Sequence, residues 1–229
     1  MSIGAEHAER PRGRGGRPSL EGSAQLSDRI LDVATGLFLG SGYGATSVEA
    51  VAKRAGISKR TLYHRFSGKE ALFEAVLRRL IARWLPPFDG ALLEAPSLSD
   101  ALHRAAEEML KVALTEEALA LHRIAIVEAG RFPWLARMMR ELGMARGVER
   151  IARFLGSRIA SGEFRPLDPR FVAEQFILMV VTGPQRRALG LGPVMTPAEL
   201  AGWIEATVGL FLDGCRSPAA PGFRRSQSP

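Results

Sequence analysis

The residues with the clearest chemistry lie in one short basic segment of the chain. Residues 46–69 contain six lysines and arginines and a single acid, Glu49. Four side chains in this segment lie within six positions and could read the edges of base pairs: Lys59, Arg60, Thr61 and His64. Arg and Lys can bond guanine O6 and N7, and a threonine methyl can contact a thymine methyl. The segment predicts binding to a polyanion such as DNA; ordinary solvated charge is the alternative interpretation.

A helix-turn-helix would hold these side chains in position. We predict the following parts in order: a capping box over 46–49, a helix over 47–55, a turn over 55–58 and a helix over 58–66. Gly56 tolerates the positive φ that such a turn often needs. Helix geometry of about 100° per residue buries Leu62 and Phe66 and turns the basic side chains outward. A helical hairpin with a merely solvated outer face is the structural alternative.

With these residues the chain closely resembles the N-terminal DNA-binding domain of the TetR family of bacterial transcription regulators. The matching stretch covers 27–75 without a gap and includes ILDVA and then GYGATSVEAVAKRAGISKRTLYHRFSGKEAL. The resemblance implies base contacts by Lys59, Arg60, Thr61 and His64. It implies phosphate contacts by Thr46, Ser47, Tyr63 and Lys69. Arg65 departs from the family pattern, which usually has His or an aromatic residue near this position.

A second motif lies downstream. The run VEAGRFP at 127–133, followed by Leu142-Gly143, looks like the AefR-like group of TetR C-terminal domains. This resemblance implies a helical domain that forms a homodimer and binds a small molecule.

The two ends of the chain are basic and of low complexity. We expect residues 1–25 to form a disordered arm and 216–229 a disordered tail. Arg12, Arg14 and Arg17 are similar to the minor-groove-reading extensions of some relatives, and an uninvolved basic tail is the alternative.

Everything between the ends has helical periodicity, so we predict an all-α protein. The expected helices cover 26–40, 67–85, 99–114, 116–130 and 133–161, with two more opened by Asp168-Pro169 and Thr196-Pro197. We expect a DNA-binding domain with its connecting helix over 26–85 and a dimerisation and ligand-sensing domain over 86–215. No apolar run is long enough for a membrane helix, because the longest, Phe176–Val181, stops at Thr182-Gly183-Pro184.

Two apolar sets predict how the C-terminal domain is used. The segment Phe171–Val181 is apolar nearly all round its helix, more than one face within a single chain can cover. The resemblance implies that the last two long helices form a four-helix bundle with their copies, a role that suits this composition. The expected interface residues are Phe171, Phe176, Met179, Val180, Trp203, Thr207 and Phe211. The candidate pocket residues are Trp84, Met109, His122, Trp134, Met138 and Phe176. Simple core filling is the alternative role for each of these six.

Other kinds of site find no support in the sequence. The four histidines are scattered, so we expect no metal site, and we expect no cofactor and no catalytic group. Cys215 is the single cysteine, which fits a reducing cytoplasm, and no secretory signal is expected.

We therefore predict a cytoplasmic, nucleoid-associated homodimer that represses transcription from a palindromic operator in double-stranded DNA. A small-molecule effector would release it, and we expect no membrane partner. The alternatives are a ligand-independent activator or architectural protein, and an all-helical enzyme or ligand-binding module with a vestigial helix-turn-helix.

Overall fold

The computed structural model describes residues 20–84 and 95–217 of the chain. In this part every regular element is a helix, and the all-α prediction is confirmed. The α-helices are α1 (Leu20–Ala45), α2 (Val48–Arg54), α3 (Lys59–Arg65), α4 (Lys69–Trp84), α6 (Leu98–Ala113), α7 (Glu116–Glu128), α8 (Pro133–Met139), α9 (Ala145–Ala160), α10 (Pro169–Ala188) and α11 (Pro197–Cys215). A π-helix, η1 (Arg140–Met144), joins α8 to α9.

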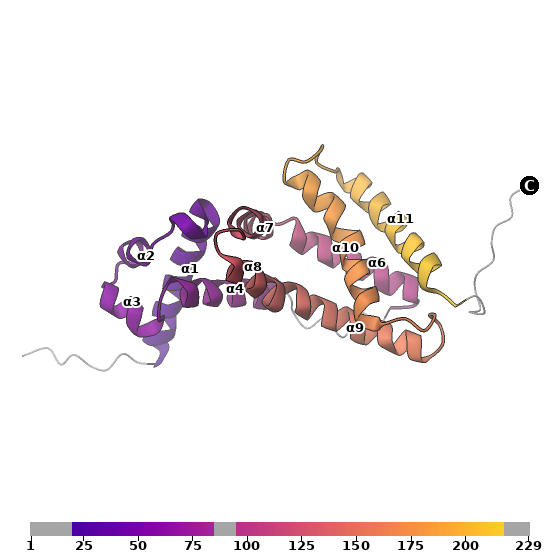
Figure 1. Cartoon of the computed structure of the whole chain (residues 1–229), viewed down its shortest axis with the longest axis horizontal. Helices are drawn as coiled ribbons and strands as arrows, with labels where there is room; N and C mark the ends of the chain where they lie inside the picture. The colour runs from indigo at the N-terminus through magenta and orange to yellow at the C-terminus, as the bar shows by residue number, and fades with distance from the viewer. Residues whose placement is uncertain (1–19, 85–94, 218–229) are drawn as a thin grey trace, which may run out of the picture.

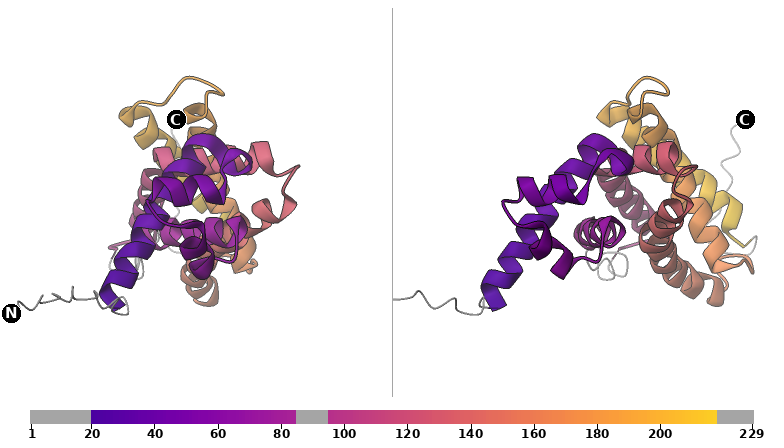
Figure 2. Two further views of the ribbon diagram at one scale, coloured as in Figure 1. Left: turned by 90° about the vertical axis from the view of Figure 1, so that its left-hand side faces the viewer. Right: turned by 60° about the vertical axis from the view of Figure 1, so that its left-hand side comes forward.

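The helices bury their apolar faces in two separate cores. The N-terminal core includes Phe38, Leu62 and Phe73 from α1, α3 and α4, together with side chains of α7 and α8. The C-terminal core includes Phe176 and Phe211 and is built by α6, α9, α10 and α11. In Figure 1, α1–α4 lie at one end of the molecule and α10–α11 at the other, with α7 and α8 between them. The right-hand view of Figure 2 shows the same two-part arrangement from another side.

Helix α1 is longer than the sequence predicted at both ends. It begins at Leu20, so residues 20–25 are helical, and their assignment to a disordered arm is wrong. At the other end the helix bends at Gly42, whose φ of +86° is open to glycine at little steric cost. The helix was expected to end at residue 40; instead it continues through this kink, and its last residue is Ala45.

The capping box of α2 was predicted one residue too early. Ser47, not Thr46, is the N-cap, and its side chain accepts the Ala50 N–H at 3.1 Å. Thr46 is 4% exposed and donates its hydroxyl to the carbonyls of Gly42 and Leu37, at 2.8 and 3.1 Å. The register is wrong because a threonine and a serine stand side by side, and only the fold decides which one is turned inward.

Two further expectations for the C-terminal half need correction, and one helix there runs farther than its apolar segment. The helix expected over 133–161 is divided by η1, a local widening that periodicity does not reveal. Helix α10 runs through Pro184 to Ala188, although the apolar run ends earlier. The tail begins later than residue 216, because Arg165 N–H donates to Cys215 O and Ser217 N–H donates to Glu163 O.

The N-cap residues of α10 and α11, and the prolines that follow them, were predicted correctly. Asp168 caps α10 and Thr196 caps α11, with Glu199 completing a capping box around Thr196. The expected domain boundary between 85 and 86 lies outside the described residues. Within the two described ranges, no helix has the length and apolarity needed to cross a membrane.

Burial of His122 makes the stability of the fold depend on pH. Burial lowers the pKa of this imidazole below its usual value of 6.5. As the pH falls, the unfolded chain takes up the proton first, so the free energy of unfolding should decline below about pH 6.5. In His122→Gln this part of the decline should be missing when urea unfolding is compared at pH 7 and pH 5. The exposed His64→Gln is the matched control, and equal pH dependence in the wild type and His122→Gln would contradict the assignment.

Candidate DNA-binding site

Helices α2 and α3 form a helix-turn-helix, as predicted. The turn is closed by backbone bonds from Gly56 N–H to Lys53 O and from Ile57 N–H to Ala52 O, at 3.2 and 3.0 Å. Gly56 has a φ of +68°, the conformation for which the sequence placed a glycine there. Ser58 then caps α3 by accepting the Thr61 N–H at 3.0 Å. The tight turn fixes α3 against α2 and leaves its outer face free.

The outer face of α3 carries the predicted base-reading residues. Lys59, Arg60 and His64 are exposed, and Leu62 is buried on the opposite side. Thr61 is half-buried, and its hydroxyl lies 2.8 Å from that of Ser58. The structure therefore brings these side chains to one helix face, and their contact with bases stays a prediction.

One acid lies beside this basic face. Glu49 of α2 forms an ion pair with Lys59 across the turn, with 2.5 Å between Oε1 and Nζ. The bound ammonium lowers the pKa of the Glu49 carboxyl. Because both side chains are more than half exposed, the pair is screened by water and adds little stability. Lys59 must leave this partner, or share it, before it reaches a base.

The four predicted phosphate contacts have different surroundings. Ser47, the N-cap of α2, and Tyr63 of α3 are both exposed. Lys69 is half-buried, and its Nζ donates to Gly44 O at 3.0 Å, 4.3 Å from the centre of the Tyr43 ring. Burial lowers the pKa of Lys69, and its ammonium has further N–H donors for a phosphate. The hydroxyl of Thr46 is buried and bonded to two carbonyls, so it is not available to a phosphate, and the predicted phosphate contact of this side chain is wrong.

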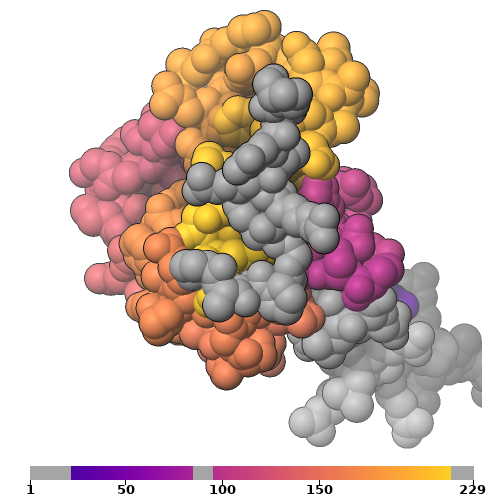
Figure 3. Space-filling model, turned by 90° about the vertical axis from the view of Figure 1, so that its right-hand side faces the viewer, coloured from indigo at the N-terminus to yellow at the C-terminus, as the bar shows by residue number. Residues whose placement is uncertain are grey.

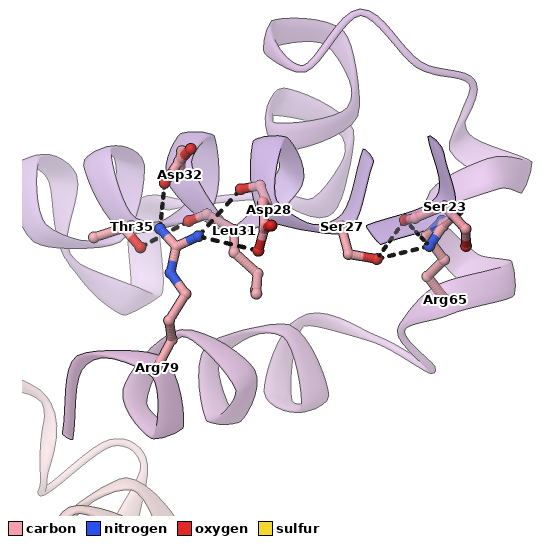
Figure 4. A network of polar contacts seen from close by, with 8 residues as sticks. All are labelled: Ser23, Ser27, Asp28, Leu31, Asp32, Thr35, Arg65 and Arg79. Atoms are coloured by element: carbon pink, nitrogen blue, oxygen red, sulfur yellow. Dashed lines mark hydrogen bonds and ion pairs between the residues drawn. The ribbon is translucent and has the colours of Figure 1, made fainter. Parts of the chain in front are cut away.

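Arg65 binds the start of α1 instead of facing outward with the base-reading set. Its guanidinium donates to Ser23 O, Ser23 Oγ and Ser27 Oγ, at 3.0, 3.1 and 2.7 Å. Figure 4 shows Arg65 reaching both serines, while Arg79 of α4 reaches Asp28 and Asp32 farther along α1. The departure from the family pattern at Arg65 thus has a structural role, because this arginine joins α3 to the first turns of α1.

This contact was not predicted from the sequence, although a signal was present. Ser23 and Ser27 are four residues apart, so they lie on one face of any helix that begins before Leu26. The arginines of the predicted minor-groove arm, Arg12, Arg14 and Arg17, lie outside the described residues.

Comparison with known proteins gives the family. Residues 30–76 match the model described as bacterial regulatory proteins of the tetR family. Residues 100–214 match the C-terminal domain of AefR-like transcriptional repressors. The chain belongs to the TetR family.

Solved structures of TetR regulators agree over nearly the whole described chain. A TetR-family regulator from Mesorhizobium loti is 30% identical with a TM-score of 0.74, covering 85% of this chain and 98% of that one. The flavonoid-responsive regulator FrrA is 35% identical with a TM-score of 0.71, covering 86% of this chain and all of that one.

Curated relatives match over shorter stretches. The HTH-type transcriptional regulator UidR of Escherichia coli K12 is 39% identical over 66 residues, 27% of this chain and 34% of UidR. RutR of the same strain is 43% identical over 58 residues, 25% of this chain and 27% of RutR. The chain therefore matches about a third or less of the length of these two relatives.

Within this TetR fold, the predicted pocket residues are divided between the two cores. Met109 and Phe176 pack in the C-terminal core, whereas Trp84, Trp134 and Met138 pack against the N-terminal core. Trp134 and Met138 line an open cleft of about 210 Å³ together with charged side chains of α4 and α8. Helical periodicity marks an apolar face without telling which core receives it, and a common pocket for these residues stays a prediction.

The predicted dimer interface is also corrected in part. Phe176, Val180, Thr207 and Phe211 are buried inside the single chain, so they offer no surface to a second copy. Trp203 and Met179 are half-buried, and the Trp203 indole N–H donates to Val180 O at 2.9 Å. Only Phe171 among the seven is largely exposed, at 58%.

The remaining histidine and metal expectations concern the described residues alone. His103 bonds Ser99 O and Glu205 through its two ring nitrogens, both at 2.8 Å, as a surface histidine would. In residues 20–84 and 95–217, no cluster of three His, Cys, Asp or Glu side chains is suited to a metal ion.

The Arg65 contact can be tested by removing it. Arg65→Ala deletes three hydrogen bonds to the first turns of α1. We expect the free energy of unfolding to fall by roughly 1–3 kcal/mol. Backbone amides that follow Ser23 should also exchange faster by mass spectrometry. Arg78→Ala is the control, since its exposed pair with Glu74 should contribute no more than about 0.5 kcal/mol. Equal effects of the two substitutions would show that Arg65 does not stabilise α1.

Proposed function

We propose that this chain is a homodimeric repressor that binds a palindromic operator through α3 and leaves it when a small molecule binds the C-terminal helices. The observation that carries the proposal is the exposed face of Lys59, Arg60 and His64 on the second helix of a helix-turn-helix. Such a face fits the major groove, where an arginine can bond guanine bidentately. This activity belongs in the bacterial cytoplasm, at the nucleoid.

Release by a small molecule is supported by the relatives. FrrA is described as flavonoid-responsive, and the chain is 35% identical to it over 86% of its own length. The C-terminal half also matches AefR-like repressors. A ligand that favours one conformation lowers DNA affinity, and linkage requires DNA to lower ligand affinity by the same factor. Small molecules that copurify with the protein should therefore be identified by mass spectrometry and then added to the DNA complex. A copurified compound that leaves DNA affinity unchanged would favour the ligand-independent alternative.

The homodimer is supported by apolar side chains left uncovered on α10 and α11. Phe171 and Leu178 lie seven residues apart on α10 and are 58% and 43% exposed, and Leu210 of α11 is 67% exposed. Atoms of α10 and α11 make up much of the face drawn in Figure 3. A twofold axis through this face would present two α3 helices to successive major grooves, about 34–36 Å apart.

Base reading by Arg60 can be separated from general DNA affinity. Arg60→Ala should weaken binding to a duplex selected from random DNA by the wild type by roughly 1–3 kcal/mol. Binding to unselected duplexes should change less, because base contacts carry the sequence preference. Fluorescence anisotropy on both duplexes measures the difference, with Arg78→Ala of α4 as the inert control. Equal losses on selected and unselected DNA would refute base reading by Arg60.

The dimer face can be tested with charges on exposed positions. Leu178→Glu and Leu210→Glu should produce monomers, because a carboxylate buried without a partner opposes association. Both variants should also lose operator affinity, since one half-site holds one α3. Leu191→Glu, at an equally exposed position between α10 and α11, is the control. Sedimentation velocity decides the result: intact dimers in both variants would exclude this face.

A further inference from the structure

The motif VEAGRFP leads from the end of α7 into α8. It holds the bent end of α1, residues 42–45, which is the turn that precedes the helix-turn-helix. Glu128 Oε2 accepts the backbone N–H of Gly44 at 2.7 Å, across 84 positions in sequence. The carboxylate fits between two glycines: a Cβ on Gly42 would lie 2.8 Å from Oε1, and one on Gly44 would lie 2.9 Å from Oε2. Real Cβ atoms essentially never come this close, so a side chain at either glycine would displace the Glu128 carboxylate from its present position.

Gly44 is held from two elements at once. Its N–H donates to the Glu128 carboxylate of α7, and its carbonyl accepts from the Lys69 ammonium of α4. Both bonds involve a charged group and are partly buried, which makes them stronger than bonds between neutral groups in water. The turn is thereby fixed to α4 and α7 together.

The side chain between the two glycines is held as well. The Tyr43 ring packs edge-on against Phe132, which belongs to the motif, and against Trp134 at the start of α8, with centroids 5.0 and 5.1 Å apart. On its other side Tyr43 contacts Phe38 and Phe73 of the N-terminal core. Burial, together with the charges of nearby carboxylates, raises the pKa of Tyr43 to about 12, so the ring stays neutral.

Another link between α4 and α7 is much weaker. Arg83 and Glu117 form an ion pair at 2.7 Å, but their side chains are 56% and 38% exposed. Exposed pairs of this kind are screened by water and contribute little. The Glu128 contact is therefore the polar bond best suited to fix the turn before α2 relative to α7.

From this geometry we infer that Glu128 is a positioning residue that sets the operator half-site spacing the dimer accepts. The inference rests on the proposed homodimeric DNA binding. The held turn leads directly into α2 and α3, and so determines the angle of α3 relative to the C-terminal helices. In a dimer that angle fixes the distance between the two α3 helices, and one added base pair changes the required distance by about 3.4 Å.

The test compares operators of different spacing. The probe is a palindromic duplex selected from random DNA by the wild type, together with versions whose centre is one base pair longer or shorter. Glu128→Ala should bind the selected spacing roughly tenfold or more weakly, as expected for losing a bond to a charged group. Its preference for that spacing over the altered ones should shrink as well. Glu128→Gln, whose amide oxygen still accepts from Gly44, should retain most of the preference. Glu128→Asp, with a shorter reach, should lose it.

The controls separate positioning from folding. Glu117→Gln removes the exposed pair on the same helix and should behave as the wild type. Amide exchange at Gly44 should accelerate in Glu128→Ala and Glu128→Asp, which shows without DNA that the contact is lost. If Glu128→Ala and Glu128→Asp lose affinity for all spacings by the same factor, or keep the wild-type preference, the inference is overturned. If the wild type selects no palindrome, the proposed function fails together with it.

Discussion

The packing of the Tyr43 ring is the contact on which the arrangement of this molecule depends. Tyr43 lies where α1 ends, and its ring touches Phe38 and Phe73 on one side and Phe132 and Trp134 on the other. Edge-to-face aromatic contacts add to the burial of the rings themselves. Because the first pair belongs to α1 and α4 and the second follows α7, this cluster joins the DNA-binding helices to the segment that leads from α7 into α8.

Charge is arranged differently from apolar surface. The basic side chains gather on α2, α3 and the start of α4, whereas Glu49 pairs with Lys59 and Glu128 accepts the N–H of Gly44. A concentrated positive face raises the affinity for a polyanion, and this affinity falls as the salt concentration rises. Glu49 holds a cation of this face in place, and Glu128 of α7 holds the backbone of Gly44.

The C-terminal half shows how far periodicity alone can lead. A helix that is apolar nearly all round, such as α10, has to be covered on several sides, and the sequence suggested a second copy for this role. The structure assigns Phe176 and Val180 to the chain's own core and leaves Phe171 and Leu178 for any partner. All four side chains are apolar, and only the packing decides which are buried and which are exposed.

By itself, the sequence determined the helical class, the helix-turn-helix, the turn glycine Gly56 and the outward face of α3. These features depend on neighbours within about ten residues, through periodicity, capping and turn chemistry. The tertiary structure alone decided the burial of Thr46, the contact of Arg65 with Ser23 and the contact of Glu128 with Gly44. The contacts of Arg65 and Glu128 join residues 42 and 84 positions apart, and the inward turn of Thr46 depends on the bend of α1. All three depend on how the helices pack, because a helix pattern fixes which face is apolar but not what lies against it.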